Sequence, residues 1–464
     1  MTDLTPAAGA VSPNGISPNG SCNAGIPLVS DQVTDEMTPA EPHFANAYTH
    51  TPSQSLSDLA LFTKGHPWAL YEELRTEAPV SWHGETPTGT GFWALVNTAD
   101  IRAVELDTQT FSSAAGGINI NYGVPETRHP ELYKAALNTM ICLDQPFHMP
   151  LRHAHMPFFT PAYVAGLRAR IDKKIDSLLD AMAQAGPELD FVEHFAAQLP
   201  MFTLCEMLGI PEDERAKLFE WMHYLERAQD TISRRGIGGI DPEFLMRFLA
   251  EMTAMFAYGR AILADRRASP RDDLLSAIAN AQVEGELLSP EFLDGSWLLI
   301  LFAGNDTTRN SLSGTIRLLT EFPDQRACLL EAPDKISAGV DEAIRMVSPV
   351  IYMRRTATKD TRIGEQRIAA GEKVVMFYGG ANRDPAVFAD AAQFDVNRAN
   401  AADHMAFGYG PHVCLGKRVA NMQLEAALKA ILSRFPKITT TGDIDIAPSN
   451  FVHAISRLGV SLTG

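Results

Sequence analysis

The sequence has few cysteines and no long apolar run. Its five cysteines form no Cys-x-x-Cys pair and no metal-finger spacing, which is typical of a reducing, intracellular compartment. The most apolar run, 297–303, is far shorter than the roughly 20 residues that span a bilayer. We therefore expect no membrane anchor.

Basic residues are also scarce, and the first 63 residues contain neither Lys nor Arg. This excludes the basic start of a signal peptide and the Arg-rich face of a transit peptide, so we expect a cytoplasmic protein. The formal net charge of −17 argues against nucleic acid as a partner. A small molecule or another protein is the expected partner.

The chain divides into a short tail and one large domain. Residues 1–45 are rich in Pro, Gly, Ser, Asn and Thr and repeat the sequence Ser-Pro-Asn-Gly. Such a segment buries too little apolar surface to offset the entropy of ordering, which predicts a disordered tail. Residues 46–464 contain no further linker, and the length favours one large domain or two fused lobes.

The apolar patterns predict a mainly α, α+β domain. Helical periodicity dominates between residues 160 and 350, and alternating patterns appear on both sides of that region. We expect a large helical lobe with a long central helix and a small β-rich lobe. The predicted helices are 68–78, 163–182, 213–227, 242–267, 290–320, one ending near Val347, and 417–435, and the predicted strands are 80–82, 91–96, 361–363, 366–368 and 373–378.

The predicted helix 290–320 has clear signals at both ends. Ser289 suits the N-cap, Pro290 the first helical position, and Phe322 with Pro323 the end. About 31 residues give a rod of roughly 45 Å. Because its centre is apolar on nearly all faces, we expect it to run through the interior.

One cysteine lies in a glycine-rich segment. Residues 407–416, Phe-Gly-Tyr-Gly-Pro-His-Val-Cys-Leu-Gly, precede the helix predicted at 417–435. Cys414 is thereby placed at a helix N-terminus, where the dipole and free N–H groups favour an anionic sulfur that can bind a metal. The alternative is a cysteine that acts only as a small buried apolar residue.

This segment resembles the haem-binding loop of the cytochrome P450 family, Phe-x-x-Gly-x-Arg/His-x-Cys-x-Gly, at every fixed position. The resemblance implies a cytochrome P450 fold, haem b as cofactor and O2 as co-substrate, with Cys414 as the axial thiolate ligand of the iron. It also implies that the other loop residues contact the haem, namely Phe407, Gly408, Gly410, His412 and Gly416.

The centre of the long helix carries the sequence Ala-Gly-Asn-Asp-Thr-Thr at 303–308, which resembles the oxygen-activation motif of the same family. The resemblance implies that Asp306 relays protons, that Thr307 holds the activated oxygen and its water, and that Ala303 lies against the haem. Asp and Thr can bond to nearby backbone, so we expect a local opening of the helix. The alternative is a buried helix that is merely kinked.

Two further sets of residues match the family. Glu342 and Arg345, at i and i+3, together with Arg398, resemble its buried Glu-Arg-Arg cluster, which is structural. Four cationic side chains match positions that bind the haem propionates, and a permanently charged arginine suits a carboxylate. They are His148, Arg152, Arg354 and His412, with Arg355 as the neighbouring alternative to Arg354.

The resemblance also implies a substrate pocket and a lid. The matching pocket positions are almost all apolar, so a lipophilic substrate is expected. They are Phe302, Ala303, Val350, Ile351, Asn450, Phe451 and Val452. A helical hairpin at 213–267, with a glycine-rich turn at 236–239, is expected to form a mobile lid.

The predicted function is insertion of one oxygen atom from O2 into a C–H bond of a lipophilic small molecule, an aliphatic chain, terpenoid or steroid. The resemblance extends from about Phe62 to the C-terminus, and 299–424 is most similar to the bacterial branch of alkane and fatty-acid ω-hydroxylases and sterol oxidases. Electrons from NAD(P)H would arrive through a ferredoxin and its reductase, docking near Arg152, Lys417 and Arg418 of a monomer.

Other functions were weighed against this one. A peroxide-driven or rearranging enzyme of the same fold usually lacks the acid-Thr pair that is present at Asp306 and Thr307. A haem-thiolate gas sensor needs neither that pair nor a lid, and a lipid carrier needs neither Cys414 nor the propionate-binding arginines.

Overall fold

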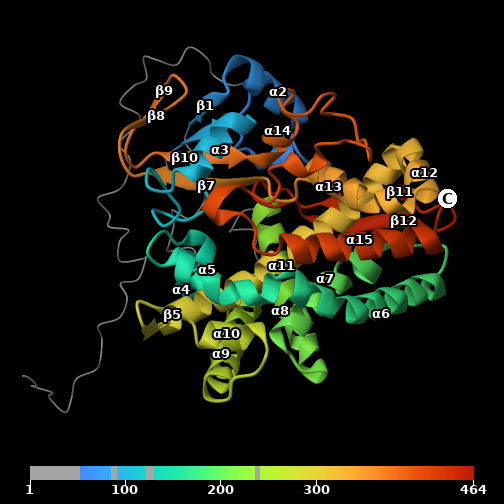
Figure 1. Cartoon of the computed structure of the whole chain (residues 1–464), viewed down its shortest axis with the longest axis horizontal. Coiled ribbons are helices and arrows are strands. Elements are labelled where there is room, and N and C mark those ends of the chain that lie inside the picture. Colours follow the sequence, from blue (N-terminus) through green and yellow to red (C-terminus); the bar gives the residue numbers. More distant parts are fainter. Residues whose placement is uncertain (1–52, 85–90, 121–129, 236–240) are drawn as a thin grey trace, which may run out of the picture.

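The computed structural model describes residues 53–84, 91–120, 130–235 and 241–464. The tail predicted at 1–45 and the glycine-rich turn predicted at 236–239 lie outside the described residues. The predicted α+β organisation is confirmed, with a β-rich part and a larger helical part (Figure 1).

The β-rich part is built on a five-stranded sheet of order β1-β2-β10-β7-β3. Strand β10 pairs in parallel with β2 and antiparallel with β7, which joins two regions far apart in the sequence. Helices α2, α3 and α14 lie beside it (Figure 1). The bounds are β1 Val80–His83, β2 Phe92–Leu95, β3 Phe111–Ser112, β7 Tyr352–Ala357, β10 Lys373–Phe377, α2 Trp68–Glu77, α3 Thr98–Leu106 and α14 Tyr378–Asn382.

The sheet packs apolar clusters on both faces, which is why β10 is buried along its whole length. Val374 and Met376 belong to the cluster that includes Tyr378, whereas Val375 and Phe377 belong to the opposite one. Consecutive residues of β7 therefore also face different surroundings.

The helical part contains most of the remaining chain. Its helices are α4 Pro130–Leu137, α5 His148–His155, α6 Pro161–Ala185, α7 Gln198–Leu208, α8 Arg215–Arg235, α9 Pro242–Ala268, α10 Leu274–Ala279, α11 Pro290–Glu321, α12 Pro323–Glu331, α13 Ile336–Val347 and α15 Lys417–Arg434. The helical periodicity of the sequence predicts α6, α9, α11 and α15 to within three residues at each end, whereas the helix predicted at 213–227 continues to Arg235 in α8.

Helix α11 begins and ends where the sequence signals placed it. Ser289 is the N-cap, Pro290 the first residue, and Phe322 follows the last. Its 32 residues span about 48 Å and pack against α4, α7, α9, α13 and β11. The interior position predicted for this helix is confirmed.

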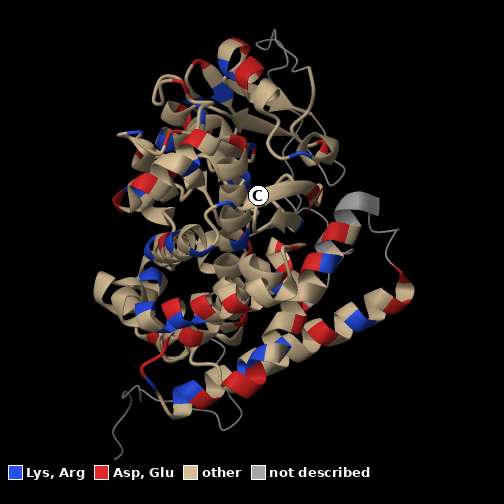
Figure 2. Ribbon diagram, turned by 90° about the vertical axis from the view of Figure 1, so that its right-hand side faces the viewer, with Lys and Arg blue, Asp and Glu red and all other residues tan. Residues whose placement is uncertain are grey.

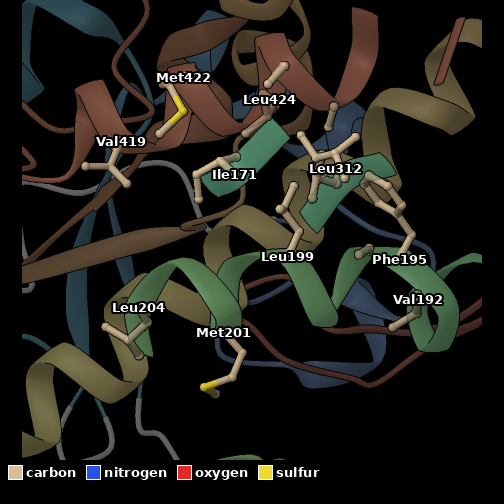
Figure 3. Close-up of a cluster of buried hydrophobic side chains, with 14 of the residues drawn as sticks. Ile171, Val192, Phe195, Leu199, Met201, Leu204, Leu312, Val419, Met422 and Leu424 are labelled. Carbon is tan, nitrogen blue, oxygen red and sulfur yellow. The ribbon is translucent and has the colours of Figure 1, made fainter. Parts of the chain in front are cut away.

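The largest apolar cluster forms where α6, α7, α11 and α15 meet (Figure 3). Ile171, Leu199, Leu312 and Leu424 come from these four helices, and Leu424 is 1% exposed. Close packing here fixes the start of α15, and hence Cys414, relative to the middle of α11.

A second sheet, of order β11-β12-β4, was not predicted. It consists of β11 Thr439–Ile446, β12 Ile455–Ser461 and β4 Glu188–Asp190, and two short hairpins complete the β structure: β5 Gln282–Val283 with β6 Glu286–Leu287, and β8 Thr361–Ile363 with β9 Gln366–Ile368. The turn between β11 and β12 brings Phe451 and Val452 to the segment before β7.

Acidic and basic side chains are interspersed along the helices in the view of Figure 2, without a large face of one sign. Within the described part of the chain, no helix combines the length and the apolar character that crossing a membrane requires.

Candidate active site

The loop before α15 is closed by its own backbone. The Cys414 N–H donates to the Phe407 carbonyl at 2.8 Å, and between them lies the short helix η11, Gly410–His412. Gly408 and Gly410 have φ of 69° and 66°, which favours glycine. A Cβ on Gly410 would lie 2.8 Å from the Glu105 carbonyl oxygen of α3, so the close approach of α3 also requires glycine there.

The Cys414 thiol lies at the N-terminus of α15, as predicted. Burial raises the pKa of this thiol, whereas the N–H groups of Gly416 and Lys417 and the charges of Arg152 and Lys417 lower it. These N–H groups and positive charges are the surroundings that stabilise an anionic sulfur bound to a metal.

Cys414 is surrounded by protein atoms, which is why burial raises the pKa of its thiol, yet its side chain is accessible to solvent. Ala303, in the middle of α11, is likewise accessible although Leu301 and Asn305 on either side of it are buried. Since α11 and α15 pack against each other, the two accessible side chains belong to neighbouring parts of the fold.

The polar turn of α11 bonds back to its own backbone. Thr307 Oγ1 donates to the Ala303 carbonyl at 3.0 Å, Asn310 Nδ2 to the Asp306 carbonyl at 2.8 Å, and Ser311 Oγ to the Thr307 carbonyl at 2.8 Å. The helix is α-helical throughout, so the expected local opening is not observed. Each carbonyl accepts the side-chain bond with its second lone pair and keeps its place in the helix.

Asp306 lies among buried charges. Arg309 Nη2 is 3.5 Å from Asp306 Oδ1, and Arg309 Nη1 is 2.6 Å from Glu226 Oε1 of α8. Burial is the main cause that raises the pKa of Asp306 to about 7, and Glu226 adds to it while Arg309 opposes it. An acid with a pKa near neutral can both take up and release a proton under physiological conditions.

A cluster of cationic and imidazole side chains lies beside the loop. The rings of His148 and His412 stack with their centroids 3.9 Å apart, and Arg152 Nη2 donates to the Val413 carbonyl at 2.7 Å. Burial, with the charge of Arg152, lowers the pKa of His148 to about 4; burial, with Arg355, lowers that of His412 to about 2. Both imidazoles are therefore neutral and offer N–H donors.

The two arginines of β7 have different surroundings. The charge of Arg355 lowers the pKa of both histidines, and its guanidinium pairs with Glu105 at 3.1 Å. Arg354 donates to the carbonyls of Gly116 and Asn119 at 3.0 and 3.2 Å. Because consecutive strand residues point to opposite faces, the two guanidinium groups lie in different surroundings, and Arg355 is the one whose charge acts on the histidines.

The structure brings Glu342, Arg345 and Arg398 together. Arg345 donates to both carboxylate oxygens of Glu342 at 2.7 Å, and Arg398 Nε donates to Glu342 Oε1 at 3.0 Å. Arg345 also donates to the carbonyls of Asn382 and Ala391. The triad therefore fastens α13 to the segment that leads to the Cys414 loop.

The expected pocket residues come together in part. Val350 and Val452 form an isolated antiparallel bridge, and Ile351 N donates to the Phe451 carbonyl at 2.9 Å. Val350, Phe451 and Val452 are partly exposed, as is Phe302 on α11. Ile351 differs, because it is fully buried in the sheet cluster. Asn450 is also buried.

Comparisons with known proteins agree with this site. The family profile "Cytochrome P450" matches residues 336–457. A linalool 8-monooxygenase of Pseudomonas putida is 35% identical over 405 residues, which are 87% of this chain and 97% of that protein. The chain belongs to the cytochrome P450 family.

Two further relatives extend the comparison. A methyl-branched lipid omega-hydroxylase of Mycobacterium tuberculosis is 33% identical over 85% of this chain and 92% of its own. The crystal structure of a Mycobacterium marinum cytochrome P450 in complex with pseudoionone has a TM-score of 0.80 at 34% identity, covering 90% of this chain and 100% of that one. The expected P450 fold and monooxygenase class are thus confirmed.

Cytochromes P450 use haem b and O2, with reducing equivalents from NAD(P)H through partner proteins, and the residues present fit a haem. Arg152, Arg355, His148 and His412 form a set of donors, of which His148 and Arg355 are buried and the other two are partly exposed. Asp144 is a nearby carboxylate that raises the pKa of His148. It already accepts hydrogen bonds from Ser112 Oγ and the Ser113 N–H. A donor set with few free acceptors suits the two propionates of haem b.

Sequence reasoning missed several residues of this site. Glu105, Asp144 and Glu226 reach it only through tertiary packing, and nothing in their local sequence marks them. Arg309 had a signal, because it lies three residues after Asp306 on one helix face.

Proposed function

We propose that this P450 hydroxylates an acyclic, methyl-branched lipophilic chain of the isoprenoid type, with electrons delivered by a separate ferredoxin. The observation that carries the monooxygenase site is the placement of two accessible side chains, Cys414 just before α15 and Ala303 on α11, since these two helices pack against each other. Thr307 lies one turn beyond Ala303 and bonds to its carbonyl.

The substrate class is supported by the pocket residues and by the relatives. Phe302, Val350, Phe451 and Val452 are partly exposed and apolar, so they offer no partner to a charged or strongly polar substrate. Linalool and pseudoionone are both acyclic isoprenoids, and the mycobacterial hydroxylase is named for methyl-branched lipids. A narrow, flexible, branched chain is the feature that these compounds share.

In this proposal, haem b supplies the oxidising power that inserts oxygen into a C–H bond, and the chain holds the haem and manages protons. Cys414 is the thiolate ligand, stabilised by the N–H groups of Gly416 and Lys417. Arg152, Arg355, His148 and His412 would hold the propionates. Phe407, Gly408, Gly410 and Gly416 would shape the loop that holds Cys414.

Asp306 and Thr307 of α11 would carry the proton. Thr307 Oγ1 donates its own hydrogen to the Ala303 carbonyl, so its lone pairs remain available to accept a hydrogen bond. Asp306, whose pKa is raised to about 7, delivers the proton toward that hydroxyl. Together these two residues would deliver a proton at the Thr307 hydroxyl, so bulk water would not need to enter the site.

Electron delivery is expected at the Cys414 side of the molecule. Arg418 is exposed at the start of α15, whereas Lys417 Nζ lies 5.4 Å from the centre of the Phe407 ring. A positive local field in a chain of net charge −17 can steer an acidic electron carrier to this site.

The experiment is a spectral titration of the purified ferric protein with three ligand classes: linear fatty acids, acyclic isoprenoids and steroids. A ligand that displaces water from the iron shifts the Soret band, whichever redox partner is used. We expect the tightest binding from acyclic isoprenoids, followed by their hydroxylated products in reconstituted turnover. A shift with steroids alone would contradict the proposed substrate class.

A further inference from the structure

Glu226 of α8 forms a four-residue polar cluster with Asn305, Asp306 and Arg309 of α11. Arg309 Nη1 donates to Glu226 Oε1 at 2.6 Å, and Arg309 Nη2 lies 3.5 Å from Asp306 Oδ1. Asn305 Nδ2 donates to Glu226 Oε1 and to Asp306 Oδ1, both at 3.3 Å. The two carboxyl groups therefore share one guanidinium and one amide.

The charges in this cluster do not balance unless a proton is present. Two carboxylates beside one guanidinium carry a net charge of −1, which is unfavourable because Arg309 is only 7% exposed and Asp306 only 16%. One proton shared between the acids makes the cluster neutral. The two carboxyl groups lie within hydrogen-bonding reach of each other, and this contact helps to raise the pKa of Asp306.

The two acids of the cluster differ in their exposure to solvent. The Glu226 side chain is 27% exposed, more than that of Asp306, so Glu226 is the acid nearer to solvent. Two polar atoms of the cluster, Arg309 Nε and Asn305 Oδ1, are buried without a hydrogen-bond partner among the residues that the structure describes. They leave room for the hydrogen bonds to rearrange as a proton moves.

Other charged groups of the packed helices have partners elsewhere. Glu206 of α7 pairs with Arg170 and Arg215. On α9, Glu251 accepts from Trp221 and Arg260 pairs with Asp294. The ionisable groups that act on Asp306 are thus Arg309 and Glu226.

We propose that Glu226 is the outer carboxyl of a two-acid relay that supplies protons to Asp306, and that it draws the charge of Arg309 away from Asp306. The inference rests on the proposed role of Asp306 in proton delivery. In each transfer an O–H bond of Glu226 breaks as an O–H bond forms on Asp306, and Glu226 then takes a replacement proton from solvent. Glu226 is a positioning and relay residue and does not touch the substrate.

The test compares Glu226→Gln with Glu220→Gln, which removes a negative charge from an exposed position of the same helix. Asp306 is titrated in the ferric protein by infrared spectroscopy, using the carboxyl band that Asp306→Asn removes. We expect wild type and Glu220→Gln to titrate near pH 7. In Glu226→Gln the pKa should fall by about one unit, which lowers the protonated fraction at pH 7 about fivefold.

Turnover provides the second readout. In Glu226→Gln we expect kcat to fall about tenfold and its solvent deuterium isotope effect to rise, with the spectral affinity for substrate unchanged. Glu226→Asp, which keeps an acid, should recover part of the rate. One outcome would contradict the role of Glu226 and leave that of Asp306 standing. In it, Glu226→Gln leaves both the Asp306 titration and the isotope effect unchanged, while Asp306→Asn still slows turnover. Wild-type turnover in Asp306→Asn would overturn the proposed proton delivery itself.

Discussion

Glu342 and Arg345 form a bidentate ion pair in which both hydrogen bonds are 2.7 Å long and neither side chain is exposed. We expect Glu342→Ala to destabilise the fold by about 3–5 kcal/mol, because it leaves the Arg345 charge buried and unpaired. Denaturant unfolding of the purified variant measures this loss. The matched control is Arg367→Ala, which removes an exposed ion pair with Asp360 and should cost less than about 1 kcal/mol. Equal losses in the two variants would contradict the prediction.

Thr307→Ala is expected to separate NADH consumption from product formation. The variant loses the hydroxyl that accepts a hydrogen bond at the oxygen site, so more of the reducing equivalents should leave as hydrogen peroxide. The ratio of peroxide to hydroxylated product measures the effect, which we expect to be about tenfold or more. Thr320→Ala, which removes a similar back-bond near the end of α11, serves as the control. Product yield equal to that of wild type in Thr307→Ala would contradict its role.

Arg355 and Arg354 are expected to differ in haem retention. Arg355→Ala removes the guanidinium beside His148 and His412 and should lower the haem content per protein. Arg354→Ala should retain more haem, because the Arg354 guanidinium donates to the carbonyls of Gly116 and Asn119. Arg355→Lys keeps the charge but loses the planar fork, and should lie between wild type and Arg355→Ala. The Soret-to-protein absorbance ratio is the measurement, and a larger loss in Arg354→Ala would reverse the assignment.

Gly410→Ala should disturb the Cys414 loop. Its φ of 66° costs a non-glycine residue about 1–2 kcal/mol, and the new Cβ would lie 2.8 Å from the Glu105 carbonyl. We expect reduced haem content and a lower Tm. Gly166→Ala, in helix α6 with open space around it, should leave haem content unchanged and raise stability slightly. Full haem retention in Gly410→Ala would show that α3 can move away from the loop.

Acid is expected to destabilise the protein below about pH 6.5. Burial lowers the pKa of His83 to about 3, so between pH 6.5 and that value the unfolded chain binds the extra proton and the folded chain does not. Its stabilising contribution is therefore complete above pH 6.5 and is lost as pH falls, by about 1.4 kcal/mol per pH unit.

Replacing His83 should remove only the part of this pH dependence that His83 contributes, because other buried histidines such as His404 also have a lowered pKa. The slope of unfolding free energy against pH, measured between pH 6.5 and 5, should decrease by about one proton in His83→Asn. His153→Asn is the control, since His153 is exposed. Identical slopes in the two variants would mean that His83 titrates alike in the folded and unfolded states.

The sequence predicted features that depend on local signals. Helix α11 was placed to within one residue because a cap, a proline and a terminal Phe-Pro pair mark its ends. The start of α15 at Lys417 followed from the glycines before it. The family motifs located Cys414, Glu342 and Asp306 in the same way.

Features that depend on distant contacts were not predicted. The choice between Arg354 and Arg355 depends on the register of β7 against β10, where Arg355 lies opposite Val374. Glu226 meets Arg309 only because the fold brings α8 to α11, although 82 residues lie between the two in the sequence. A local pattern contains no information on such a pairing.

The contact between Val350 and Val452 depends on the geometry of the backbone and not on which side chains the two residues carry. Main-chain pairing joins the two segments, including the bond from Ile351 N to the Phe451 carbonyl, and no particular side chain is needed for it. Exchanges at these two partly exposed positions would reshape the proposed pocket while the backbone pairing stays intact. New substrate preferences can thus arise here through single substitutions of low structural cost, which makes this bridge a place where the enzyme can diversify.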